Sequence, residues 1–172
     1  MDDEPTSIAL PEGGHLFLAE IGEPSNNDLR VVVVLGRASE TAVETELGPA
    51  FPVGTDDTSR AFELIWWNYV AYGVLDERWV TPDDSPIVGT RRFGRKTASA
   101  FLAYVAASTW ATDEHPGELT HWYLNTEWHC LDVVSVEPPE LRELKLQEAR
   151  GEAAKLAARG GPFIYEAARA GK

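Results

Sequence analysis

Residues Arg60 to Trp79 read R-A-F-E-L-I-W-W-N-Y-V-A-Y-G-V-L-D-E-R-W, an aromatic-rich run from which we build the fold prediction. Successive side chains fall alternately on two faces, and many of them are β-branched or aromatic, which indicates a strand. Apolar residues occupy both parities, which is typical of a strand covered on both faces. Asn68 marks a turn or a bend. Because no Gly or Pro adjoins it, we predict one long bent strand rather than a hairpin.

A second segment of the same character runs from Leu119 to Val136 and reads L-T-H-W-Y-L-N-T-E-W-H-C-L-D-V-V-S-V. We expect it to pair with the first segment and to complete the frame of the fold. The pattern leaves open whether it is one straight strand or a hairpin that turns at Asn125 and Thr126.

The remaining elements give an α+β protein. Leu16–Ile21 and Leu29–Leu35 predict a hairpin, and four consecutive valines in the latter indicate burial on both faces. Apolar residues at helical spacing predict a helix over Thr97–Thr109, capped by Thr97 or Ser99. Pro138-Pro139-Glu140 predicts the start of a peripheral C-terminal helix.

The predicted core is a bent, mainly antiparallel sheet or partly closed barrel covered by one helix. The expected divisions are a mobile acidic leader at 1–13, one domain at 14–138, the helix at 139–160 and a frayed tail at 161–172.

Composition limits the classes of function. The chain has 172 residues, one cysteine (Cys130) and a net charge of −13, and residues 1–58 alone carry −10. One cysteine excludes an intrachain disulfide, and the start of the chain lacks the pattern of a signal peptide, so we expect a cytoplasmic protein. Such an acidic surface repels nucleic acid and anionic membrane and attracts a basic protein. The simpler interpretation is that the charge maintains solubility.

The first candidate site is a cluster of His121, Glu127, His129, Cys130 and Asp132, which are residue types that bind metals or transfer protons. On a straight strand, the two histidines would lie roughly 26 Å apart at about 3.3 Å per residue, which excludes a shared metal. In the hairpin turning at Asn125 and Thr126, His121 would lie opposite Cys130. The alternative is a sheet histidine beside a buried free cysteine. We predict no metal and no cofactor.

The second candidate is the basic run Gly89-Thr90-Arg91-Arg92-Phe93-Gly94-Arg95-Lys96-Thr97, which precedes the predicted helix. It departs from a nucleotide-binding loop because an arginine separates the second glycine from the lysine. A weaker anion site at the helix N-terminus would use four side chains: Arg91, Arg92, Arg95 and Lys96. The alternative is a solvated basic loop.

Three stretches together resemble a family of small uncharacterised bacterial proteins. They are F-E-L-I-W-W-N-Y-V-A-Y-G-V-L-D-E-R-W, F-L-A-Y-V-A-A-S-T and H-W-Y-L-N-T-E-W-H-C-L-D-V-V-S-V-E-P-P. Members pair an aromatic N-Y-V-A-Y strand with a terminal H-x-I-D-V-V-S stretch, and the likeness covers roughly residues 61–139. Trp128 departs from the small polar residue expected there. The resemblance implies a compact bacterial cytoplasmic protein and no known activity.

We therefore expect a non-catalytic acidic module that binds another protein, in the manner of an immunity or inhibitor protein. Six tryptophans supply aromatic surface for a core or an interface. The rival is a small-ligand-binding protein or enzyme with a pocket at the sheet mouth. Its residues would be His121, Tyr123, His129 and Cys130. A third alternative is a homodimer formed through the C-terminal helix.

Overall fold

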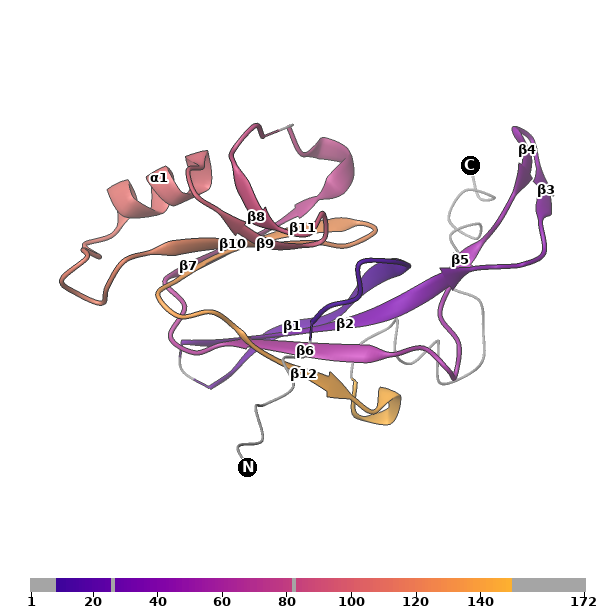
Figure 1. Ribbon diagram of the computed structural model, residues 1–172, viewed down its shortest axis with the longest axis horizontal. Helices are drawn as coiled ribbons and strands as arrows, with labels where there is room; N and C mark the ends of the chain where they lie inside the picture. The colour runs from indigo at the N-terminus through magenta and orange to yellow at the C-terminus, as the bar shows by residue number, and fades with distance from the viewer. Residues whose placement is uncertain (1–8, 26, 82, 150–172) are drawn as a thin grey trace, which may run out of the picture.

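The computed structural model describes residues 9–25, 27–81 and 83–149 and shows two β-sheets stacked face to face (Figure 1). The first sheet has the strand order β1-β2-β6-β12, with β5 added to β2; the second has the order β7-β11-β10-β9-β8. Every pairing between the strands described is antiparallel. The antiparallel α+β class is confirmed, and the sheets are open rather than closed into a barrel.

The strands of the first sheet and its additions come from both ends of the described chain. They are β1 (His15–Ser25), β2 (Asp28–Ala38), β5 (Val53–Gly54), β6 (Ala61–Trp66) and β12 (Glu140–Leu144). The β1–β2 hairpin is confirmed, and all four valines from Val31 to Val34 are fully buried. Burial on both faces explains why four successive positions of this strand are apolar.

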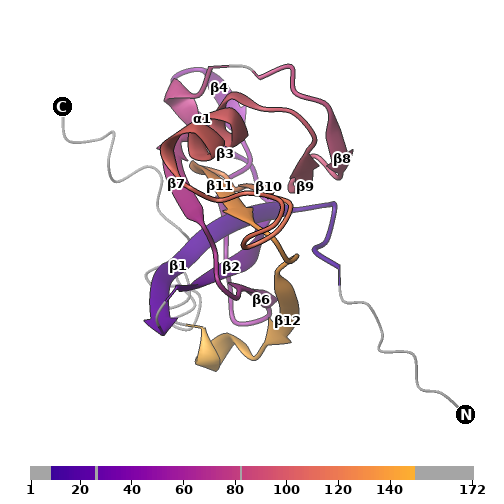
Figure 2. The same cartoon turned by 90° about the vertical axis from the view of Figure 1, so that its left-hand side faces the viewer.

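The second sheet is continuous in the chain apart from one helix. Its elements are β7 (Ala71–Asp76), β8 (Ile87–Gly89), β9 (Phe93–Lys96), α1 (Ala100–Ser108), β10 (Thr120–Asn125) and β11 (His129–Ser135). Figures 1 and 2 show α1 on the side of this sheet that faces away from the first. Short 3-10 turns follow β7 and β12, at Glu77–Trp79 and Leu146–Glu148. None of the helices described is long and apolar enough to span a membrane.

The main core lies between the sheets. Side chains from both inner faces form one apolar cluster: Leu29, Val31, Val33, Phe62, Leu64, Trp66, Leu124, Leu131 and Val133. Leu10 is buried in the same cluster, so the expected leader contributes to the core at this position; residues 1–8 lie outside the described part. A smaller cluster covers the outer face of the first sheet and includes Val32, Ala61 and Leu144.

The prediction of one bent strand over Arg60–Trp79 is wrong. This run forms β6 in the first sheet and β7 in the second, so the chain crosses between the layers at residues 67–70. Asn68 has a φ of 56°, a left-handed conformation that Asn adopts more readily than most residues. A turn therefore needed neither Gly nor Pro. The two long segments still pair, because β7 lies beside β11.

The predicted C-terminal helix is also wrong over the described residues, which end at 149. Residues 140–144 form β12, which pairs along β6, and the expected continuation to 160 lies outside the described part. The run E-L-R-E-L suits both a helix and a strand. The open edge of β6 offers it backbone hydrogen bonds, and Leu144 becomes buried against Ala61 in the smaller cluster. Tertiary pairing thus overrides the local helix preference.

Beyond the sandwich, the chain between β2 and β5 extends as a hairpin of β3 (Val43–Thr45) and β4 (Gly48–Ala50) (Figure 1). A hydrogen bond of 2.7 Å from Ser39 N to Pro52 O closes its base. We call residues 39–52 the arm.

Candidate functional site

The polar centre of the second sheet is a chain of hydrogen bonds that runs through His121. Its imidazole is fully buried. The Ser99 Oγ lies 2.6 Å from His121 Nδ1, and the Asp132 Oδ1 lies 2.7 Å from His121 Nε2. Lys96 Nζ lies 3.6 Å from the same Asp132 oxygen and 2.9 Å from Asp83 Oδ2. We call these five residues the His121 network.

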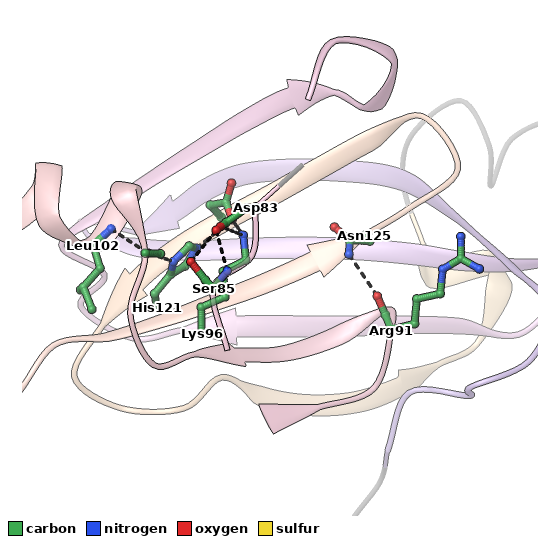
Figure 3. Close-up of polar contacts among 9 residues, drawn as sticks. Asp83, Ser85, Arg91, Lys96, Leu102, His121 and Asn125 are labelled. Carbon is green, nitrogen blue, oxygen red and sulfur yellow. Dashed lines mark hydrogen bonds and ion pairs between the residues drawn. The ribbon is translucent and has the colours of Figure 1, made fainter. Parts of the chain in front are cut away.

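The strand register brings this network together. His121 on β10 lies directly opposite Lys96 on β9, and Tyr123 lies opposite Asp132 on β11. Directly paired residues share a face, and so do residues two positions apart, so these side chains all project from the outer face. Figure 3 shows His121, Lys96, Asp83 and Ser85 gathered at one end of the sheet.

Ser99 joins the network to the helix. It is the N-cap of α1, and its Oγ accepts a hydrogen bond from Leu102 N at 3.0 Å. The Phe101 ring covers His121, with ring centroids 5.4 Å apart. Gly73 on β7 lies beneath this ring, where a Cβ would meet it at 3.7 Å, an ordinary van der Waals distance. The network therefore fastens the first turn of α1 to the sheet.

Electrostatics in the network follow from its ion pairs. Hydrogen bonds from Ser85 and Lys96 lower the pKa of Asp83 to about 2. Burial alone would lower the pKa of Lys96, but Asp83 and Asp132 outweigh burial and raise it. Lys96 and Asp83 therefore keep their charges over the neutral range.

Ser99, His121 and Asp132 have the connectivity of a nucleophile, a base and an orienting carboxylate. A substrate must reach both the nucleophile and the base, yet His121 has no exposed surface beneath Phe101. Ser99 Oγ is also engaged with Leu102 N. In this packing the three residues act chemically as a satisfied hydrogen-bond chain.

The four residues predicted to form a pocket do not converge. Of the two alternatives left open for Leu119–Val136, the hairpin forms, but its turn lies two residues later than the one considered, at residues 126–128. His121 consequently lies opposite Val134, and Cys130 lies opposite Asn125, so the dyad of His121 and Cys130 does not form. Cys130 is roughly 13 Å along the sheet from His121, at about 3.3 Å per residue.

The other two predicted pocket residues are placed apart as well. His129 has the opposite parity to Cys130 and Asp132 on β11, so it faces the other side of the sheet from His121. Tyr123 is buried, and its hydroxyl donates a hydrogen bond to Thr90 O. Burial, with smaller contributions from Asp132 and Glu77, raises the pKa of the Cys130 thiol, which disfavours the thiolate nucleophile. Among the residues described, no three His, Cys, Asp or Glu side chains are grouped closely enough to hold a metal ion.

The predicted anion site is divided in the same way. Lys96 is committed to Asp83 and Asp132, and Arg92 pairs with Glu127 at 3.4 Å and with Gly14 O. Arg95 has the opposite parity to Lys96 on β9. Arg91 lies at the far end of the sheet, where its carbonyl accepts from Asn125 Nδ2 at 3.0 Å (Figure 3).

A second polar centre, which sequence reasoning missed, lies on the outer face of the first sheet. Glu63 is 1% exposed, and its two carboxylate oxygens accept hydrogen bonds from Arg30 and Arg142. Arg30 also pairs with Glu20 at 2.8 Å. Burial alone would raise the pKa of Glu63, but the hydrogen bonds from Arg142 and Arg30 outweigh burial and lower it. We call Arg30, Glu63 and Arg142 the Glu63 network.

The Glu63 network forms one wall of a cleft of about 470 Å³. Carboxylates outnumber arginines in its lining, which consists of Glu20, Gly22, Glu23, Pro24, Arg30, Glu63, Arg142 and Glu148. One signal for this centre existed in the sequence: a single glutamate inside the apolar run F-E-L-I-W. A charge in such a position needs a partner.

A smaller cleft of about 270 Å³ lies beside the end of α1 and is mostly apolar, with Val70, Trp110 and His115 among its lining residues. Neither cleft includes any of the residues predicted as a site. Comparisons with protein-family models, with curated proteins and with solved structures found no match to this chain.

Proposed function

We propose that this protein is an acidic interaction module that binds a basic protein, in the manner of an inhibitor or immunity protein of the bacterial cytoplasm. The observation that carries the proposal is the segment 38–59, which holds five carboxylates and no lysine or arginine. The segment runs from the end of β2 through the arm and β5 toward the start of β6. Every carboxylate in it is exposed.

Exposed apolar side chains support a protein partner rather than a purely electrostatic role for the charge. Large apolar residues that are at least half exposed occur at several places: Leu47, Phe51, Leu75, Trp79, Ile87, Tyr104 and Trp110. Leu47 is 96% exposed. Aromatic and aliphatic anchors set among charges are typical of interfaces, where the charges steer the encounter and the anchors supply affinity.

The cleft beside Glu63 agrees with a basic partner. Four carboxylates and two arginines line it, and the Glu63 carboxylate is already compensated by Arg30 and Arg142. The remaining carboxylates favour a positively charged group over an anion.

The rival proposal of a ligand or enzyme site around His121, Tyr123, His129 and Cys130 requires at least two of these side chains to meet in a cavity. The register separates the two histidines onto opposite faces of the sheet. The interaction proposal therefore has the stronger structural support.

The test is native mass spectrometry of tagged protein purified gently from its host, at low and then at high salt. We expect a stoichiometric complex with a protein of high isoelectric point, lost at high salt because screening weakens exposed charge pairs. A chain that carries a small molecule or metal and no protein at either salt concentration would contradict the proposal.

A further inference from the structure

The arm packs little against the rest of the described chain. Of its fourteen residues, only Gly48 and Pro52 are not exposed. No arm residue belongs to either core cluster. A two-stranded hairpin without a packed face is marginally stable in water. The arm therefore contributes little to the stability of the sandwich.

The arm combines apolar and acidic side chains. Val43, Leu47 and Phe51 are 39%, 96% and 57% exposed, and Leu47 lies in the turn between β3 and β4. Large apolar side chains left exposed beside one another in the chain are a feature of binding surfaces. Glu40, Glu44 and Glu46 are also exposed. Within the described part of the chain, these three carboxylates form no ion pair.

The base of the arm is held to the first sheet by hydrogen bonds, whereas its tip projects away from the sheet. Strand β5 pairs with the end of β2, and Ser39 N donates to Pro52 O across the base. Arg37, just before the arm, contacts Thr58 and lies 3.8 Å from Asp56, so its charge is partly used at the base. The tip carries both negative charge and an exposed apolar side chain, and Figure 1 shows β3 and β4 projecting at the end of the molecule opposite α1.

We infer that the arm is the docking element for the basic partner, an inference that rests on the proposed function. Leu47 would insert into an apolar socket on the partner, while Glu44 and Glu46 pair with lysine or arginine side chains around it. The acidic charge selects a basic protein as the occupant, since a second copy of this chain would present the same negative charge. A few side chains seated in such sockets carry most of the affinity of an interface.

The test uses photo-crosslinking in the host followed by measured binding. A benzoyl-phenylalanine replaces Leu47 in one chain and Tyr104, which is 65% exposed on α1, in the control. The expected result is one basic protein crosslinked from position 47 and not from position 104. That protein is then purified and titrated against the whole chain.

Charge reversal supplies the matched comparison. Glu44→Lys with Glu46→Lys, and separately Leu47→Ser, should each weaken binding about tenfold or more, whereas Asp113→Lys with Glu114→Lys should weaken it less than about threefold. Asp113 and Glu114 are exposed in the loop after α1. Each double variant replaces two carboxylates by two lysines, so both change the net charge equally. Equal weakening by both, or crosslinking from Tyr104 alone, would overturn the arm as docking element while leaving the interaction intact. The absence of any protein partner would overturn both proposals.

Discussion

The His121 network and the arm treat their side chains in opposite ways. In the network, a fully buried imidazole has a hydrogen-bond partner at each nitrogen, and the adjoining lysine lies between two carboxylates. In the arm, apolar side chains are exposed and three carboxylates lie free of ion pairs among the residues described. Polar groups that satisfy one another stabilise a fold, whereas groups left exposed at a cost indicate a role outside the fold. Changes to the interior networks should therefore affect stability, and changes to the arm should affect binding.

The largest loss of stability is expected from Glu63→Ala. This change leaves Arg142 without its carboxylate partner and leaves Arg30 with Glu20 alone, on a face that buries Val32 and Ala61. Hydrogen bonds to a charged group contribute about 1.5 kcal/mol or more each, and this change removes two, so the expected loss is about 3 kcal/mol. Urea unfolding measures the free energy of unfolding, and a loss below about 1 kcal/mol would show that the network is not compensated as described.

The Glu63 carboxylate should also affect how the free energy of unfolding declines at acid pH. Its pKa is lowered in the folded state, so the unfolded chain binds the proton more readily. The contribution is therefore present above the unfolded pKa and is lost as the pH falls through the folded pKa. Glu63→Gln should flatten the decline of unfolding free energy below about pH 4.3, the ordinary value for glutamate. An unchanged slope in that variant would contradict the assignment.

The next largest loss is expected from His121→Phe. The substitution leaves the Ser99 hydroxyl and the Asp132 carboxylate without their buried partner. Leaving such groups unsatisfied costs about 2 kcal/mol. Thermal and urea unfolding should show this loss, and Cys130→Ala, on the same face but outside the network, should cost less. Equal losses from the two variants would indicate that only packing volume matters at this sheet.

A smaller loss is expected from Ser99→Ala. The variant removes the N-cap of α1 together with one bond to His121. Loss of a serine cap costs about 1 kcal/mol. Hydrogen exchange of the amides in the first turn of α1 should accelerate, and Ser99→Thr should restore much of the protection because it keeps the hydroxyl. Unchanged exchange at Leu102 would argue against the cap.

The smallest effect on stability is expected from Leu47→Ser. The side chain is 96% exposed and packs on neither core cluster, so its removal should change the free energy of unfolding by less than about 0.5 kcal/mol. Val33→Ser, inside the main core, is the contrasting variant. A clear destabilisation by Leu47→Ser would mean that the arm packs as part of the fold, and the comparison between the arm and the interior would fail.

Local patterns in the sequence predicted the antiparallel sheets, the first hairpin and the helix, because these depend on alternation, turns and caps close together in the chain. Such patterns could not predict which segments distant in the chain pack or pair with one another in the two sheets. Asn68 permits either a bend or a crossing between sheets, and only the packing of Trp66 and Leu131 in one core decides between them. Residues 140–144 became a strand because β6 offered a free edge.

The candidate sites show the same limit. The composition identified His121, Asp132 and Lys96 as polar groups, but their meeting depends on a register set by a hairpin turn at residues 126–128. A turn displaced by two residues moved Cys130 away from His121. The glutamate inside F-E-L-I-W indicated a buried charge that needs partners, but those partners lie 33 and 79 positions away in the chain, so no short motif could identify them.

The most direct test of the account compares two variants in one set of native mass spectra. Tagged Ser99→Ala and Leu47→Ser are purified from the host at low salt, and the fraction of each chain that carries the protein partner is measured. The account predicts that Ser99→Ala keeps the partner although it unfolds more easily, and that Leu47→Ser loses the partner although its stability is unchanged. The opposite pattern, with the partner lost from Ser99→Ala and kept by Leu47→Ser, would place function at the His121 network and contradict the account.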